Sequence, residues 1–172
     1  MVLSEIVQKT MNQGIQKHLI ILNTTLPMTE LGVYPSRYGE IEAQDDKKIY
    51  FVHGLPGFDN AREFSLIALP EKQYKGFFLL QNLENEDIAF LTLPLPEEIG
   101  LISENDLKEA AMATGCPVKD ALFLLVISIV QEGPKAKIYA NMRAPIVVDI
   151  HRRVAQQYVM INPDYPIRYD LT

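Results

Sequence analysis

The sequence predicts a mainly β protein, a small antiparallel β-barrel-like domain with one or two short helices and an N-terminal helical extension. From about residue 36 onward, short runs of β-branched and aromatic residues alternate with turn signals. The 172 residues are 48% hydrophobic and 22% charged, which is typical of one globular domain. Helical signals are confined to two segments. We expect residues 1–35 to form an extension and linker and residues 36–172 to form the barrel domain.

The first 22 residues have the pattern of an amphipathic helix. Apolar residues recur at steps of three to five positions, although Gly14 weakens a helix by about 1 kcal/mol. Residues 23–37 contain Pro27, Gly32 and Pro35 and are predicted to be a linker. Three arrangements stay open for the extension: docking on the barrel, exchange between subunits, or mimicry of a partner's helix.

Two β-hairpins are predicted in the next part of the chain. Residues 39–43 and 48–52 flank a polar turn and would form the first hairpin. Residues 77–81 and 88–93 flank an acidic turn and would form the second. A further strand is expected at residues 64–69, which precede a proline.

The most hydrophobic strand is predicted at residues 122–130, and its composition indicates a central place in the sheet. A Glu-Gly-Pro turn then returns the chain into residues 135–141. Residues 145–150 and 154–161 flank a basic turn and would pair. We expect the core to include Phe51, Phe58, Phe78, Phe90 and Ile146.

One further helix is well signalled. Ser103 precedes Glu104 and Asp106, which is typical of an N-cap followed by acidic residues near the positive end of the helix dipole. Gly115 and Pro117 would end this helix.

The charge is acidic and unevenly spread. The formal net charge is −6, so direct nucleic-acid binding is disfavoured, because affinity for phosphates depends on Lys and Arg. Residues 41–100 carry eleven acidic and five basic residues, and Glu84, Glu86 and Asp87 form a local acidic cluster. Such a cluster would speed encounter with a basic partner. The alternative is a solvated face that only keeps the protein soluble.

Membrane insertion and disulfide chemistry are not expected. No apolar run approaches the ~20 residues of a membrane span, since the longest, residues 121–130, is interrupted by Ser128. Residues 1–17 mix charged and polar residues and do not resemble a secretory signal. Cys116 is the only cysteine, so no intramolecular disulfide can form. We expect a cytoplasmic protein that does not bind membranes.

The sequence offers no recognisable catalytic, cofactor or metal motif. The three histidines lie far apart, and the sequence has no HExxH, GxSxG, P-loop or GxGxxG pattern. Residues 54–57 (Gly-Leu-Pro-Gly) indicate a shaped turn, and Cys116 is expected to be structural. We therefore predict a non-enzymatic binding protein. The alternative is a small enzyme or ligand-binding barrel whose pocket would hold His53 or converging carboxylates.

Several segments together resemble the family of the flagellar assembly factor FliW. The resemblance covers roughly residues 36–170, and its segments occur in the family's order and spacing. They are Tyr-Gly-Glu-Ile-Glu at 38–42, Ile-Tyr-Phe-Val-His-Gly-Leu-Pro-Gly-Phe at 49–58, Phe-Ser-Leu-Ile at 64–67, the Leu-Gln-Asn-Leu-Glu-containing stretch 78–90, Tyr-Ala-Asn-Met-Arg-Ala-Pro-Ile-Val-Val at 139–148, and the hairpin 152–160.

This resemblance implies a small β-barrel-like fold without catalytic activity. It also implies two protein partners. One is CsrA, the carbon-storage regulator, a basic RNA-binding repressor of translation. The other is flagellin, which would compete for the protein and so couple flagellin synthesis to flagellum assembly.

The acidic hairpin and a second segment are the expected partner surfaces. We expect Gln81, Asn82, Glu84, Glu86 and Asp87 to face a partner, and Asn141, Arg143 and Pro145 to form a second contact region. Proline cannot donate a ladder hydrogen bond. The segment at Pro145 is therefore either an edge that an incoming strand could pair with or only a turn at a strand start.

The chain departs from the family pattern in three places. Residues 1–34 form an extension that typical members lack, Val154 stands where a glycine follows the paired arginines, and residues 91–96 lack the usual acidic residue before proline. The last two departures motivate a second hypothesis within the family, a flagellin-binding chaperone that does not bind CsrA.

Overall fold

The computed structural model describes residues 2–10, 13–23, 31–69, 76–96 and 99–172. Three α-helices, two short 3₁₀ turns and eleven strands are present in these ranges. In chain order they are α1 (Val2–Thr10), α2 (Gln13–Asn23), β1 (Leu31–Tyr34), β2 (Ile41–Gln44), η1 (Asp45–Lys47), β3 (Ile49–Phe51), β4 (Glu63–Ala68), β5 (Phe78–Asn82), β6 (Ala89–Pro94), α4 (Glu104–Ala113), η3 (Val118–Asp120), β7 (Ala121–Glu132), β8 (Lys135–Ala140), β9 (Ile146–Asp149), β10 (Val154–Gln157) and β11 (Tyr169–Asp170).

Seven of these strands close into a β-barrel. Hydrogen-bonded neighbours run in the order β3, β4, β5, β6, β7, β9 and β10, and β10 returns to β3. That closing pair is parallel, whereas the other pairs in the barrel are antiparallel. Closure removes the unpaired edges that an open sheet would expose. The predicted mainly β, barrel-like fold is confirmed.

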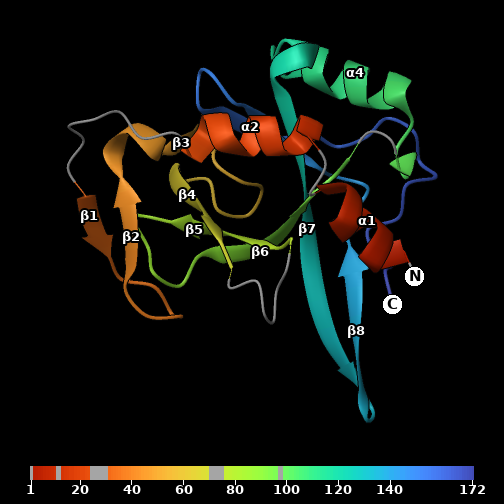
Figure 1. Cartoon of the computed structure of the whole chain (residues 1–172), viewed down its shortest axis with the longest axis horizontal. Coiled ribbons are helices and arrows are strands. Elements are labelled where there is room, and N and C mark those ends of the chain that lie inside the picture. Colours follow the sequence, from red (N-terminus) through yellow and green to blue (C-terminus); the bar gives the residue numbers. More distant parts are fainter. Residues whose placement is uncertain (1, 11–12, 24–30, 70–75, 97–98) are drawn as a thin grey trace.

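The hydrophobic strand β7 is the central element, as predicted. Its first half pairs with β6 and β9, and its second half pairs with β8 in a two-stranded arm that extends beyond the barrel (Figure 1). Both β8 and β9 lie along the same edge of β7, with Ala140 opposite Ile127 and Ile146 opposite Leu124. The five residues 141–145 therefore lie opposite only two residues of β7 and form a large bulge.

The two hairpin predictions have different outcomes. The hairpin of β5 and β6 around the acidic turn is confirmed, with Gln81 opposite Ala89. The hairpin of residues 39–43 with 48–52 is wrong, because β2 pairs with β1 and β3 pairs with β4 and β10. Burial of Ile49 and Phe51 inside the barrel outweighs the local turn. Strand β1 lies in the segment expected to be a linker.

The N-terminal extension packs on the barrel of its own chain. Ile6 of α1 belongs to one buried cluster, with β7 and α4 residues. Leu19 and Leu22 of α2 belong to the other, which fills the barrel interior. Figure 1 shows α2 lying across one end of the barrel. No helix in the described ranges is long and apolar enough to cross a lipid bilayer.

Most of the predicted core is confirmed. Phe51, Phe78 and Ile146 are buried, and Phe90 is half-buried. The prediction for Phe58 is wrong, since 42% of this residue is exposed. Phe58 follows a turn outside the strands, and the alternation of strand side chains does not direct it inward.

Helix α4 forms where its capping signals predict. The backbone N–H of Asp106 donates to the Ser103 hydroxyl at 3.1 Å, which is an N-cap bond. Gly115 follows the helix in the left-handed conformation, at φ 69°.

Candidate protein-interaction surface

Three loops meet at one end of the barrel, and we call them the acidic loop cluster. They are residues 36–40 between β1 and β2, residues 53–62 between β3 and β4, and residues 83–88 between β5 and β6. The backbone N–H of Arg37 donates to the carbonyl of Glu86, and that of Arg62 donates to the carboxylate of Glu84. The loop between β5 and β6 thus contacts both others.

Gln81 organises this cluster from inside. Its side chain is 0% exposed, so the expectation that it faces a partner does not fit the structure. Its amide oxygen accepts from the Ser36 hydroxyl at 2.7 Å, and its amide nitrogen donates to the carbonyls of Asn82 and Ile88 at 2.9 and 3.1 Å. A buried amide with its partners satisfied holds the surrounding backbone in one arrangement. We therefore assign Gln81 a positioning role.

Asn82 has a similar role and is 1% exposed. Its side-chain oxygen accepts from the backbone N–H groups of Glu84 and Asn85 at 3.1 and 2.7 Å, which shapes the turn. Its amide nitrogen donates to the carbonyl of Glu63 at 2.9 Å and ties the turn to β4. Asparagine favours turns in which its side chain accepts from the backbone ahead of it, so the residue type was the sequence signal for this role.

Glu84 turns its carboxylate toward the backbone of the neighbouring loop. One oxygen accepts from the N–H groups of Arg62 and Glu63 at 2.8 and 3.2 Å. The hydrogen bond from the Arg62 N–H is the main reason that the pKa of Glu84 lies below its ordinary value. Part of its charge is therefore used to hold the loops together.

Glu86 and Asp87, like Glu84, are exposed acidic residues of this turn. Arg37 lies 3.5 Å from Asp87, but both side chains are largely in solvent, so this pair contributes little to stability. Glu40 and Asp59, on the two adjacent loops, are also exposed. The cluster consequently presents carboxylates from all three loops to solvent.

Two exposed aromatic rings accompany these carboxylates. Phe58 packs edge-on against Phe90 at a ring-centroid distance of 5.5 Å, and Tyr38 is 69% exposed. The turn before Phe58 requires Gly54, which has φ 71° and whose added Cβ would lie 2.6 Å from the carbonyl oxygen of Asp59. Exposed aromatic residues on a fixed backbone are typical of protein interfaces. The sequence reasoning missed Phe58 because it assigned the residue to the core.

The second predicted region lies elsewhere, separated in the sheet from the β5–β6 hairpin by β7. Asn141 and Arg143 are half-buried and serve the bulge between β8 and β9. Asn141 accepts from the N–H of Ala144, and the Arg143 guanidinium donates to the carbonyl of Asn162 at 2.9 Å. These contacts hold the bulge and the C-terminal segment together.

Pro145 is buried and immediately precedes β9. Strand β9 pairs with β7 on one side and with β10 on the other, so it has no free edge for an incoming strand. Of the two alternatives for this proline, the structure supports the turn at a strand start. Direct partner contact by Pro145 is thus not favoured by the geometry.

The structure also shows where two of the departures from the family pattern lie. Residues 92–96 are buried and cannot offer a partner surface. At the basic turn, the left-handed residue is Arg153, with φ 54°, and Val154 already begins β10. The turn therefore forms without the glycine, at the cost of backbone strain at Arg153.

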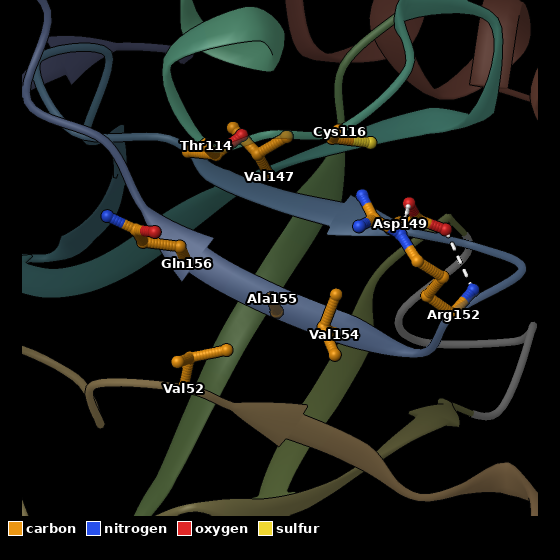
Figure 2. A pocket seen from close by; sticks show the side chains of 9 residues that line it. All are labelled: Val52, Thr114, Cys116, Val147, Asp149, Arg152, Val154, Ala155 and Gln156. Atoms are coloured by element: carbon orange, nitrogen blue, oxygen red, sulfur yellow. Dashed lines mark hydrogen bonds and ion pairs between the residues drawn. The ribbon is translucent and has the colours of Figure 1, made fainter.

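A small cavity lies between β3, β9, β10 and the end of α4 (Figure 2). It measures about 30 Å³ and is lined in part by Cys116, Asp149 and Arg152. That volume suits a water molecule and is far below the few hundred cubic ångströms of a metabolite site. Burial, with the Asp149 charge, raises the pKa of Cys116 to about 12, so its thiol is not activated.

Neither the cavity nor the exposed histidine supports catalysis. His53 is exposed just after β3 and does not line this cavity. A wider surface recess of about 300 Å³ beside β2 and β4 has Glu42 as its one carboxylate and contains no histidine among its described residues. Within the described ranges, no group of three or more His, Cys, Asp or Glu side chains could hold a metal ion.

The fold and this surface define the class, a small β-barrel protein with an acidic and aromatic loop surface. Residues 33–171 match the family model described as "FliW protein", and this chain belongs to that family.

Curated relatives agree with this assignment. The chain is 29% identical over 136 residues to "Flagellar assembly factor FliW" of Caldicellulosiruptor bescii, covering 78% of this chain and 86% of the relative. It is 30% identical over 135 residues to the protein of the same name from Clostridium botulinum strain Langeland, covering 78% and 92%. A crystal structure of the flagellar assembly factor FliW has the same fold, with a TM-score of 0.63 at 23% identity, covering 81% of this chain and 96% of that one.

Proposed function

We propose that this protein is a cytoplasmic, non-enzymatic flagellar assembly factor that binds CsrA and flagellin. Binding to CsrA would relieve its repression of flagellin translation, and competition by flagellin would couple synthesis to assembly. Membership of the FliW family and the names of the relatives support the general role. The two partners follow from the resemblance described above.

The acidic loop cluster is the observation that carries the CsrA part of the proposal. Its exposed carboxylates lie beside the exposed rings of Tyr38 and Phe58, and buried Gln81 and Asn82 fix the backbone beneath them. Opposite charge raises the rate of encounter with a basic protein, and aromatic rings on a fixed surface lower the dissociation rate. A basic regulator fits both properties.

The test is a charge reversal at the exposed end of the acidic turn. In Glu86→Lys with Asp87→Lys, we expect the association rate with purified CsrA to fall about tenfold at low salt and less at high salt. Stopped-flow or surface plasmon resonance at several salt concentrations measures this effect. Because neither side chain is buried, the variant should remain folded.

A matched control changes net charge equally but elsewhere. Glu109→Lys with Asp164→Lys reverses two exposed carboxylates outside the acidic loop cluster and should leave the association rate much closer to that of the wild type. Undiminished CsrA binding by the Glu86 and Asp87 variant would rule out the acidic loop cluster as the CsrA surface.

The second candidate function is a flagellin-binding chaperone that does not engage CsrA. The sequence departures at residues 91–96 and at Val154 motivate it, and because residues 92–96 are buried, they could alter CsrA binding only through the packing beneath the surface. Binding of each purified partner to the wild-type protein separates the two functions. Capture of flagellin without CsrA would favour the chaperone, and capture of both would favour the coupled regulator.

A further inference from the structure

Helix α2 covers one end of the barrel with a regular apolar face. Ile15, Leu19 and Leu22 follow the spacing i, i+4, i+7, and Leu19 and Leu22 join the cluster that fills the barrel interior. On the outer side of the same helix Ile20 is 60% exposed. The barrel end beneath α2 is therefore an apolar surface that accepts one face of an amphipathic helix.

An arginine of the barrel holds the C-terminal end of this helix. The Nη2 atom of Arg153 donates to the carbonyl of Ile21, in the last turn of α2, at 3.3 Å. The carbonyls of a last helical turn lack partners within the helix and carry partial negative charge, so a guanidinium there is favourable. The other terminal nitrogen, Nη1, is buried and has no hydrogen-bond partner among the described residues. Arg153 thus offers a donor pair to a helix end.

Helix α2 depends on this docking for its own order. It has only 11 residues, contains Gly14 and three isoleucines, and has no acidic residue in its first turn or basic residue in its last. Isolated helices of this length are marginal in water. A segment of this kind opens more readily than the strands beneath it.

The helix and the surface under it also differ in their relation to the family. The family model begins at residue 33, after α2, whereas the barrel strands and Arg153 lie inside it. The helix-accepting end thus belongs to the family's domain, and the helix that occupies it is an addition to that domain.

We propose that this end of the barrel is a binding site for an amphipathic helix and that α2 is its resident, displaceable ligand. The competing occupant is a helix of a partner protein with apolar residues spaced i, i+4, i+7 and a last turn that reaches Arg153. In the closed state α2 blocks the site, and the partner helix binds when α2 opens. The site is separate from the acidic loop cluster, so it does not depend on the proposed function.

The test uses the full-length chain and a labelled peptide of residues 13–23 as the competing helix. Leu19→Ala with Leu22→Ala weakens α2 in the chain and should raise peptide affinity at least tenfold over the wild type, measured by fluorescence anisotropy. Ile20→Ala, on the exposed face of the same helix, is the matched control and should behave as the wild type. A peptide carrying both leucine changes should not bind.

Arg153→Gly, added to the variant with Leu19→Ala and Leu22→Ala, tests the contribution of Arg153 to binding separately from folding. Glycine favours the left-handed conformation at this position, so the turn keeps its backbone while the guanidinium is lost. We expect several-fold weaker peptide binding, with an unfolding midpoint no lower than that of the Leu19 and Leu22 variant without this change. Undiminished binding would remove Arg153 from the site.

Two results would overturn the proposal. One is a folded Leu19 and Leu22 variant, shown by its circular dichroism, that binds the peptide no better than the wild type. The other is concentration-dependent dimerisation without peptide binding, which would assign the site to α2 of a second copy. If the variant does not fold, hydrogen exchange of the wild type decides. Amides of α2 should exchange at least tenfold faster than those of β7, and equal protection would show that α2 is not displaceable.

Discussion

The Ser36 hydroxyl donates a 2.7 Å hydrogen bond to the side-chain oxygen of Gln81, across 45 residues of sequence. This bond joins the loop between β1 and β2 to the end of β5, just before the loop between β5 and β6. At the same time the Gln81 amide nitrogen donates to the carbonyls of Glu86 and Ile88 in the loop between β5 and β6. A single buried amide therefore fixes two of the three loops of the candidate surface.

Replacing this amide should loosen the acidic loop cluster. In Gln81→Leu, the Ser36 hydroxyl and the loop carbonyls lose their partner inside the protein, which we expect to cost about 2–3 kcal/mol of unfolding free energy. Urea denaturation measures the loss, and hydrogen exchange should show faster exchange at residues 83–88. Ser36→Ala removes the bond to Gln81 and an exposed bond from the Tyr38 N–H but leaves the Gln81 amide in place, so it should cost only about 1 kcal/mol. Equal stability of Gln81→Leu and the wild type would contradict this role.

Phe58 should contribute to binding more than to stability. Because it is 42% exposed and packs on one ring, Phe58→Ser should lower the unfolding free energy by about 1 kcal/mol or less. If it anchors CsrA, the same change should weaken binding tenfold or more in calorimetry. Ile129→Ser, at a similarly exposed apolar residue of the β7–β8 arm, is the control and should leave CsrA affinity unchanged. Normal affinity of Phe58→Ser would remove the residue from the interface.

The carboxylate of Asp149 should make stability depend on pH. Burial alone would raise its pKa, but hydrogen bonds from the backbone and guanidinium of Arg152 and from the His151 N–H hold it below its ordinary value of 3.8. A depressed pKa in the folded state means that this stabilisation is complete above about pH 4 and is lost as the pH falls through the folded-state pKa.

Asp149→Asn checks this pH dependence. Oδ1 of Asp149 accepts from two N–H groups and Oδ2 accepts from Arg152 Nε at 2.7 Å, so an asparagine would place its amide N–H₂ against a donor. At pH 7 we expect the free energy of unfolding of the variant to be about 1–2 kcal/mol lower than that of the wild type, and we expect this difference to narrow below pH 4. Urea denaturation at each pH measures the difference. A difference between variant and wild type that stays constant from pH 7 to pH 3 would show that the charge is not responsible.

Cys116 should be unreactive in the folded protein. Its thiol is buried beside Asp149, and burial raises its pKa to about 12, so very little thiolate exists at pH 8. We expect Ellman's reagent to react with it only in denaturant, at a rate set by opening of the fold. Rapid reaction of the native protein at pH 8 would contradict the burial of this thiol.

The elements that the sequence predicted correctly are those whose signals are local. Ser103 caps α4 through contacts within one turn. The run over residues 122–130 is apolar enough to predict a central strand, and its first half lies buried in the barrel. The hairpin prediction for residues 39–52 failed because turn residues do not report which distant strand competes for β3. Burial of Phe51 between β4 and β10 is a property of the closed barrel.

In the candidate surface too, the features that the sequence predicted correctly are local, and those it missed depend on distant contacts. The exposed charges of Glu86 and Asp87 follow from composition at a hairpin turn, since charged residues avoid the interior unless they are paired. The burial of Gln81 and Asn82 does not follow from composition, because an amide can be buried wherever carbonyls and N–H groups lie within hydrogen-bonding distance of it. The sequence alone does not show how many hydrogen-bond partners a side chain will have in the folded protein.

By itself, the sequence determined the β-rich class, the acidic balance and the resemblance to the FliW family, because composition, turn residues and segment order are carried by neighbouring positions. Only the tertiary structure decided that α2 rests on its own barrel, that Phe58 points outward and that Arg153 takes the left-handed turn. Those outcomes depend on which surfaces meet when distant segments pack, and packing energy is shared among residues that lie far apart along the chain.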